Sequence, residues 1–151
     1  MARSELPLRV VADTNTVISG LLWHGNPRRV LDAAREGALQ LYTSASLLAE
    51  VDEVLQRRKF AQRLSLAGVS SRTLVLGYAA LASLIEPAAI APVITVDPDD
   101  DAVLACAVAA SAEAIVSGDS YLLDMEKYEE IPILTAAQLL TRLKPEQSDD
   151  T

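Results

Sequence analysis

Cysteine, histidine and aromatic residues are scarce in this sequence of 151 residues, which has one cysteine, one histidine and 4% aromatic residues. The single cysteine, Cys106, excludes an internal disulfide and fits a reducing cytoplasm. The lone histidine, His24, argues against a histidine-based zinc site and against catalysis by a histidine pair. The sequence has no G-x-x-x-x-G-K loop and no G-x-G-x-x-G loop, so nothing in it indicates nucleotide binding.

Long apolar runs are also missing, so we expect no membrane span. The first residues carry Arg3 and Glu5 with no apolar stretch behind them, which gives no sign of a secretory signal. With the single cysteine, these features favour a cytoplasmic protein. Half of the residues are nevertheless hydrophobic, which is enough for the buried core of one domain.

Basic residues are outnumbered: 13 lysines and arginines stand against 21 aspartates and glutamates, for a formal net charge of −8. This charge counts against general affinity for nucleic acid, because phosphate contacts need a basic surface. It does not exclude a nuclease, since carboxylates that bind a divalent cation no longer repel a phosphate. The two signs are also separated along the chain. Acids crowd at 97–101, and basic residues crowd at 57–63.

Short apolar runs of strand type alternate with amphipathic helical stretches, with no repeat and no second domain. The expected strands are 8–12, 39–43, 114–116 and 131–134. The expected helices are 16–22, 27–36, 45–57, 60–66, 71–84, 102–110 and 136–143. This alternation predicts an α/β fold with a parallel sheet covered by helices on both faces. Residues 1–143 would form one domain, and the polar residues 144–151 a frayed tail.

Several acids stand at loop and cap positions beside these buried elements. Asp13 follows the first strand and Asp119 follows the third, so both are expected at the carboxyl edge of the sheet, where α/β proteins bind ligands. Asp13 by itself is equally well explained as a helix cap. Glu50 and Asp52 flank the apolar stripe of one helix, and the helical wheel does not choose between them.

Three consecutive acids, Asp99, Asp100 and Asp101, precede the apolar helix expected at 102–110. Acids favour the N-terminus of a helix, but three neighbouring carboxylates repel one another and exceed what capping needs. Taken together, the acids offer the hard oxygen ligands that Mg²⁺ and Mn²⁺ prefer. Such an ion orients and activates a water and stabilises charge on a phosphate. The acids therefore predict a metal-dependent hydrolytic site.

Four segments, taken in order, resemble the PIN domain family. V-V-A-D-T-N-T-V-I-S-G-L-L-W resembles its opening and T-S-A-S-L-L-A-E-V-D-E-V-L its second acidic segment. D-P-D-D-D-A-V-L-A-C-A-V-A-A resembles the third, and A-I-V-S-G-D-S-Y-L-L the fourth. The resemblance covers about Val10 to Leu140 and points to the branch described as toxins of toxin–antitoxin systems (VapC-like). It implies a three-layer α/β/α sandwich with a mainly parallel sheet.

Residue by residue, the resemblance implies catalytic and metal-binding acids at Asp13, Glu50, Asp101 and Asp119. In the third segment it favours Asp101, which directly precedes the apolar helix, with Asp100 as the alternative. It also implies two supporting residues. Asn15 would be a polar partner that orients the cluster, and Ser117 stands where the family often has threonine, which keeps the hydroxyl.

The resemblance further implies Mg²⁺- or Mn²⁺-dependent endonucleolytic cleavage of single-stranded RNA, a cognate antitoxin that blocks the site, and a homodimer. The basic residues that could contact RNA phosphates are Arg28, Arg29, Arg57, Arg58 and Lys59. Each of these, taken alone, is more readily explained as a solvated surface residue.

Two alternatives stay open. The first is a PIN-like protein that binds RNA or a partner without cutting. The second is a phosphatase of the haloacid dehalogenase type, against which two residues count. Such a site requires an acid at position 15, where this sequence has asparagine. It also requires a lysine upstream of the last acids, and Lys59 is poorly placed for that role.

Overall fold

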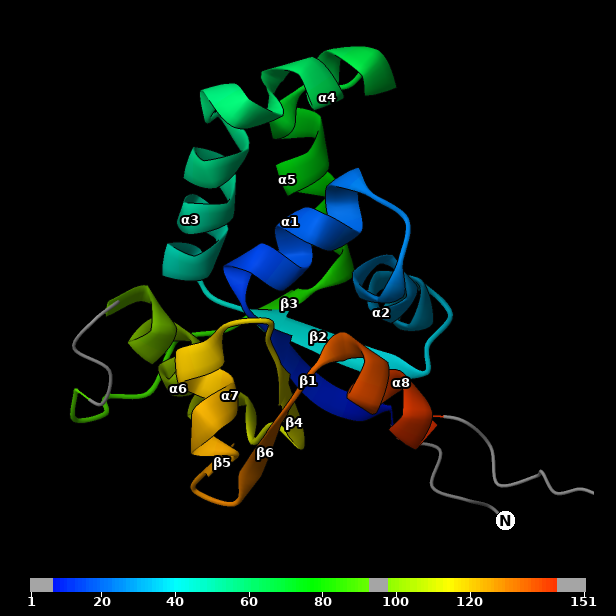
Figure 1. Ribbon diagram of the computed structural model, residues 1–151. Coiled ribbons are helices and arrows are strands. Elements are labelled where there is room, and N and C mark those ends of the chain that lie inside the picture. The colour runs from blue at the N-terminus through cyan, green and yellow to red at the C-terminus, as the bar shows by residue number, and fades with distance from the viewer. Residues whose placement is uncertain (1–6, 93–97, 144–151) are drawn as a thin grey trace, which may run out of the picture.

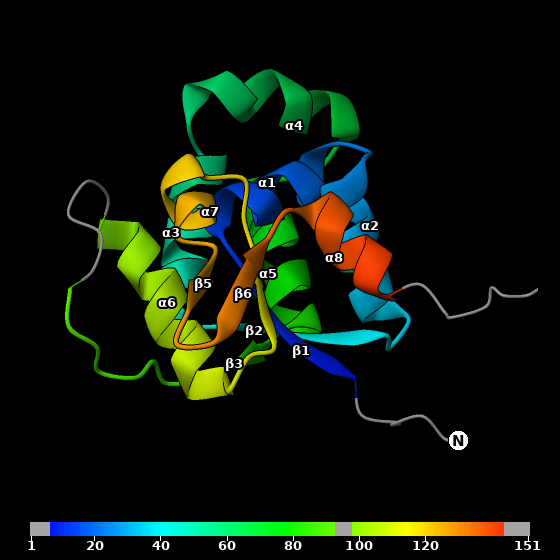
Figure 2. The ribbon, with the colours of Figure 1, turned by 60° about the horizontal axis from the view of Figure 1, so that its bottom comes forward.

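The computed structural model describes residues 7–92 and 98–143, which form a twisted sheet between two layers of helices (Figures 1 and 2). Within these residues the sheet has six strands in the order β3-β2-β1-β4-β6-β5. Four pairs of neighbours are parallel, and only β5 runs antiparallel, beside β6 at one edge. The strands are β1 (Leu8–Ala12), β2 (Leu39–Thr43), β3 (Ser83–Leu84), β4 (Ala114–Val116), β5 (Lys127–Tyr128) and β6 (Ile131–Leu134).

Helices cover both faces of this sheet. One layer holds α1 (Thr14–Leu22), α2 (Asn26–Arg35), α3 (Ala45–Leu55), α5 (Ser71–Leu81) and α8 (Ala136–Leu143). The other holds α6 (Pro98–Ala110) and α7 (Ser120–Met125). A short 3₁₀ helix, η1 (Arg58–Phe60), and α4 (Ala61–Ala67) lie at the top in Figure 1, above α1 and α5. The expected α/β/α sandwich with a mainly parallel sheet is confirmed.

Alternating side chains of the central strand β1 supply a core on each face. Val10 and Ala12 belong to the cluster that also takes residues from α1, α2, α3, α5 and α8. Val11 belongs to a second cluster with residues of α6 and α7. A strand buried on both faces reads as a continuous apolar run, which is how the buried part of β1, Val10 to Ala12, appears in the sequence.

α1 and α2 cross closely at Gly20. A Cβ atom there would lie 2.8 Å from Leu31 Cδ1 and 2.9 Å from the Pro27 carbonyl oxygen, so the crossing leaves no room for a larger residue. Asn26, which directly precedes the helix expected at 27–36, is the first residue of α2. Gly25 is the N-cap and supplies no side-chain hydrogen bond. By contrast, Ser44 and Ser70 cap α3 and α5 with their side chains.

Three short elements of the structure were not predicted from the sequence: β3, α7 and β5. The expected tail at 144–151 lies outside the described residues. In the parts of the chain that are described, no single helix is long and apolar enough to cross a membrane. Only the bent pair Arg58–Ala67 and Ser71–Leu81, taken together, reaches that length and composition.

Candidate active site

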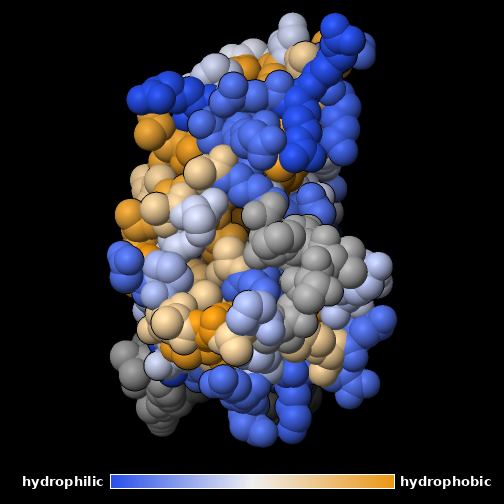
Figure 3. Space-filling view, turned by 90° about the vertical axis from the view of Figure 1, so that its left-hand side faces the viewer, coloured by the Kyte–Doolittle hydropathy of each residue, from blue (hydrophilic) through white to orange (hydrophobic). Residues whose placement is uncertain are grey.

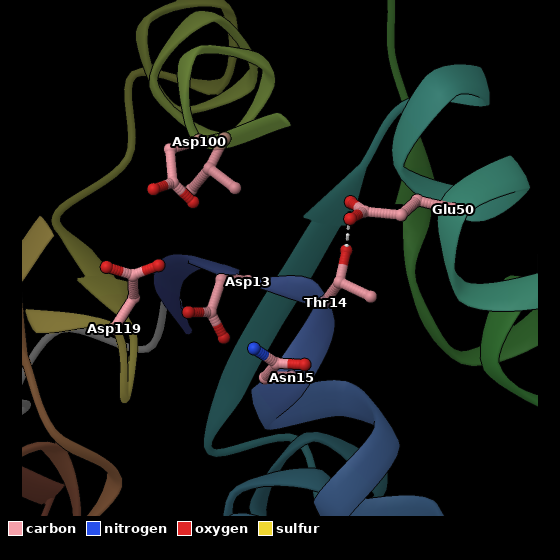
Figure 4. Close-up of a pocket in the computed structure, with 7 residues that line it drawn as sticks. Asp13, Thr14, Asn15, Glu50, Asp100 and Asp119 are labelled. Carbon is pink, nitrogen blue, oxygen red and sulfur yellow. Dashed lines mark hydrogen bonds between the residues drawn. The ribbon is translucent and has the colours of Figure 1, made fainter. Parts of the chain in front are cut away.

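Acidic side chains from four parts of the chain line one pocket at the carboxyl edge of the sheet (Figure 4). β1 and β4 are parallel neighbours, so the residues that follow them meet at the same edge. The first strand leads to Asp13 and the fourth to Asp119. The pocket is lined by Asp13, Thr14, Asn15, Glu50, Asp100, Val103 and Asp119.

Asp13 lies at the centre of this pocket and is only 4% exposed. It is the N-cap of α1: its Oδ1 accepts a hydrogen bond of 2.8 Å from the Thr16 backbone N–H. Its Oδ2 accepts a second bond of 2.6 Å from the Ser117 hydroxyl. The cap and the site acid are therefore the same residue, and both carboxylate oxygens are held in fixed directions.

Ser117, which is 1% exposed, connects Asp13 to the loop that carries Asp119. Besides donating to Asp13, its Oγ accepts a hydrogen bond of 2.9 Å from the Asp119 backbone N–H. Asp119 is in turn the N-cap of α7, and its Oδ1 accepts a 2.7 Å bond from the Tyr121 N–H. One hydroxyl thus fixes the relative positions of two pocket acids.

Glu50 reaches the pocket from α3, on the opposite side from Asp119 in Figure 4. The Thr14 hydroxyl donates a hydrogen bond of 2.5 Å to its Oε1. Asp52, the other acid on the same helix, accepts a bond of 2.9 Å from the Gln56 side chain and does not line the pocket. The structure therefore brings Glu50, and not Asp52, to the other acids. Thr14 was not singled out in the sequence, because a hydroxyl directly after Asp13 reads as part of a helix start.

In the third acidic segment, the structure places Asp100 in the pocket, where the resemblance favoured Asp101. Asp100 is 6% exposed and points toward Asp13 and Asp119, whereas Asp101 is partly exposed and does not line the pocket. α6 begins at Pro98, so these acids lie inside the helix and not before it. Successive helical residues point about 100° apart, and Asp100 shares a face with Val103, which also lines the pocket. The side chain of Asp99 lies outside the described residues.

The donor set fits a hard divalent cation. Of the described residues that line the pocket, four carry carboxylates and none is a lysine or arginine, so its potential attracts cations. Among the described residues, no three acidic, histidine or cysteine side chains are placed so that they could hold an ion by themselves. Mg²⁺ is commonly held by one or two carboxylates and keeps several waters, which agrees with acids that surround a space without closing on it.

Comparison with known proteins places the chain in a family. A model of the PIN domain matches residues 9–121, three quarters of the sequence, and this range contains all four acids of the pocket. The chain belongs to the PIN domain family. The PIN domain of RRP44 from T. brucei is similar in structure, with a TM-score of 0.44, 16% identity, and coverage of 91% of this chain and 82% of that one. No curated protein matches.

The fold of a PIN domain is of the nuclease type, and PIN domains generally act as metal-dependent nucleases, typically with Mg²⁺ or Mn²⁺. In this PIN domain the basic residues considered for RNA contact do not line the acidic pocket. Arg28 is half-buried and donates to the carbonyl oxygens of Gly20 and Leu21. Arg57 forms an ion pair of 3.6 Å with Glu53. The remaining three, Arg29, Arg58 and Lys59, are exposed.

Proposed function

We propose that this PIN domain is a Mg²⁺- or Mn²⁺-dependent endoribonuclease that hydrolyses phosphodiester bonds of single-stranded RNA. The observation that carries the proposal is the convergence of Asp13, Glu50, Asp100 and Asp119 in one pocket at the carboxyl edge of the sheet. Structural needs alone do not account for four carboxylates at one point, because each adds repulsion that a bound cation would relieve.

We assign each acid of the pocket a role in metal binding. Asp13 and Glu50 would bind the cation with carboxylates held by Ser117 and Thr14. Asp100 and Asp119 would complete the acidic surface and hold metal-bound water. When bound, the ion supplies an activated water and stabilises the charge that develops on the phosphate. Fixed hydrogen bonds to the acids keep the reorganisation on binding small, which is what a preorganised site requires.

The proposed setting is the toxin component of a type II toxin–antitoxin system in the cytoplasm, acting as a homodimer and blocked by a cognate antitoxin. Its support is the sequence resemblance to the VapC-like branch. The test is controlled expression of the chain with and without the neighbouring reading frame. Growth arrest that requires Asp13 and is relieved by the neighbour's product would support the toxin role, and unchanged growth would contradict it.

A second candidate is a PIN domain that binds RNA without cutting it. The specific observation in its favour is the absence, among the described residues, of three ligands already placed for one ion. Membership of the PIN domain family leaves the phosphatase alternative without support.

An assay of end-labelled single-stranded RNA with Mn²⁺, Mg²⁺ or chelator separates these functions. We expect cleavage with either metal, none with chelator, and none from Asp119→Asn. The matched control is Asp32→Asn, an exposed acid of α2 outside the pocket, which should cleave as the wild type does. RNA binding without cleavage under every metal condition would favour the second candidate.

A further inference from the structure

Two aromatic and two basic side chains gather at the C-terminal end of α1. We define the Trp23 platform as Trp23, Lys59, Phe60 and Arg63. The rings of Trp23 and Phe60 meet edge to face, with centroids 6.0 Å apart. The Arg63 guanidinium lies 5.7 Å from the Trp23 ring, and Lys59 Nζ lies 5.1 Å from the Phe60 ring. Trp23 is still 42% exposed, so much of the indole faces solvent.

The platform is held in place by the end of α1. Arg63 Nε donates a hydrogen bond of 2.7 Å to the Leu22 carbonyl oxygen, and the Trp23 N–H donates to the Ser19 carbonyl oxygen at 3.0 Å. Arg28 donates to the two preceding carbonyl groups of α1. These cations at the C-terminal end of the helix also complement its dipole. Trp23 is therefore a partly exposed aromatic ring that contacts Phe60 and Arg63 at a hydrogen-bonded helix end.

The charge around the platform is opposite to that of the whole chain. Residues 14–31 and 54–85, which form α1, the start of α2, and the elements from the end of α3 to α5, contain no acid. They contain seven of the thirteen basic residues, namely Arg28, Arg29, Arg57, Arg58, Lys59, Arg63 and Arg72. Figure 3 shows strongly hydrophilic side chains beside apolar ones at this end of the molecule, at the top, where Figure 1 places α4. An acidic protein thus has one basic end that carries an exposed aromatic ring.

A groove formed by α1, the start of α2 and the segments before α7 and α8 adjoins the acidic pocket. Its volume is about 430 Å³, and its lining includes Asn15 and Ser19 of α1, Asn26 of α2 and Thr135 before α8. Asn15 lines both the groove and the acidic pocket. Asn15, Ser19 and Trp23 follow at intervals of four residues, so they lie near one side of the helix. The helical rise sets Trp23 about 12 Å beyond Asn15.

We propose that the Trp23 platform is a subsite for single-stranded RNA, in which an unpaired base stacks on Trp23 while Lys59 and Arg63 contact the neighbouring phosphates. From there the strand follows α1 and the groove beside it to the acidic pocket. This inference rests on the proposed function, because it assigns the RNA to that pocket. Exposed aromatic rings beside cations bind single strands with little dependence on sequence. At about 3.4 Å per stacked nucleotide, the platform lies some three to four nucleotides from the pocket.

The test uses the fact that Trp23 is the only tryptophan of the chain. A ten-nucleotide single-stranded RNA is titrated into the protein with chelator, and both Trp23 fluorescence and the anisotropy of a labelled RNA are recorded. We expect the fluorescence to be quenched on binding. Trp23→Ala should weaken binding on the order of tenfold, Trp23→Phe should keep most of it, and double-stranded RNA should bind without quenching.

The phosphate contact is tested by salt dependence. Each lost phosphate contact lowers the slope of log affinity against log salt by about 0.7 for a single strand, so Lys59→Gln should show this decrease. Arg142→Gln, an exposed cation of α8 outside the platform, is the matched control and should leave the slope unchanged. Melting curves of every variant check that the fold is kept.

Each result separates the inference from the proposed function. Cleavage of RNA combined with unchanged binding by Trp23→Ala, or with no quenching, would overturn the subsite and leave the nuclease intact. Binding that depends on Trp23, without cleavage under any metal condition, would support the subsite and overturn the nuclease. Quenching by an acidic peptide but not by RNA would overturn the subsite in favour of a protein partner.

Discussion

The Ser117 hydroxyl donates a hydrogen bond of 2.6 Å to Asp13, from which it is separated by 104 positions in the sequence. The contact follows from the sheet. β1 ends at Ala12, β4 ends at Val116, and these two residues are partners in a parallel pair. The next residue of each strand therefore reaches the same edge, where a buried hydroxyl meets a buried carboxylate.

Removing the Ser117 hydroxyl should weaken catalysis without dismantling the fold. Ser117→Ala leaves Asp13 Oδ2 and the Asp119 N–H without this partner, so both acids lose a fixed direction. We expect a loss of activity on the order of 10- to 100-fold, the range for groups that orient metal ligands. Ser117→Thr keeps the hydroxyl and should retain most activity. Initial cleavage rates at saturating Mn²⁺ measure the effect, with the exposed Ser46→Ala as control.

Asp100 and Asp101 differ by one position and should differ strongly in function. Asp100 lines the pocket and Asp101 does not, so we expect Asp100→Asn to lower activity by about two orders of magnitude or more and Asp101→Asn to have a much smaller effect. Both variants are compared by cleavage rate and by melting temperature. A larger loss for Asp101→Asn in a folded protein would show that the third acid is Asp101, and equal losses would contradict the choice of Asp100 over Asp101.

Asp100 and Asp101 also show which part of the site could not be predicted from the sequence. The alternation of strands and helices was readable because the apolar periods are clear, and Asp13 and Asp119 followed from their places after strands. The choice between Asp100 and Asp101 depends on where α6 begins. An error of one residue there turns the side chain by about 100° and exchanges a pocket residue for a surface residue.

Other parts of the site depend on contacts that no local pattern reports. Glu50 and Asp52 flank the same apolar stripe, but in the fold Glu50 accepts a hydrogen bond from the Thr14 hydroxyl and Asp52 accepts one from Gln56. Thr14 and Glu50 are 36 positions apart. The unpredicted elements β3 and β5 have two residues each, and pairing with β2 and β6 forms them. Such short strands arise from tertiary pairing and not from their own sequence.

Thr14→Val should weaken metal binding more than it lowers the stability of the fold. Valine keeps the shape of threonine but cannot donate to Glu50, so the carboxylate loses the bond that aims it. We expect the apparent affinity for Mn²⁺ in the cleavage assay to fall on the order of 10- to 100-fold. Thr14→Ser keeps the hydroxyl and should restore most of the affinity. If Thr14→Val shows an unchanged dependence on Mn²⁺, Glu50 is not positioned by Thr14.

Divalent metal should stabilise the folded protein. A ligand that binds only the folded state adds about 2.7 kcal/mol at a concentration one hundred times its dissociation constant. We therefore expect a higher melting temperature with Mn²⁺ than with chelator at equal ionic strength. The absence of any shift with Mn²⁺ would contradict metal binding at this pocket.

Asp13→Asn separates the two roles of Asp13 in that experiment. Asparagine caps a helix as well as aspartate does, so the variant keeps the start of α1 and loses the charge. We expect equal or higher stability without metal, a smaller Mn²⁺ shift and no cleavage. Asp13→Ala removes the cap as well and should cost about 1 kcal/mol without metal. Cleavage by Asp13→Asn at the wild-type rate would show that Asp13 acts only as a helix cap.

Two buried groups predict that the protein loses stability at alkaline pH. Burial raises the pKa of Cys106 from 9.0 to about 11. Burial, and then the negative charges of Cys106 and Asp13, raise the pKa of Tyr78 well above its usual 10.0. Between pH 9 and 11 the unfolded chain releases protons that the folded chain retains. Stability is therefore fully present below pH 9 and falls as the pH rises toward 11.

The size and origin of this fall are measurable by urea unfolding at pH 8 and pH 10.5. We expect the free energy of unfolding to decrease on the order of 2 kcal/mol from Cys106, with a further loss from Tyr78. Among the described residues the Tyr78 hydroxyl has no hydrogen-bond partner, so Tyr78→Phe should cost nothing at pH 8 and should make the fall shallower. Tyr121→Phe, at an exposed position, should leave the fall unchanged. The same pH dependence in both tyrosine variants would show that Tyr78 titrates alike in the folded and unfolded chains.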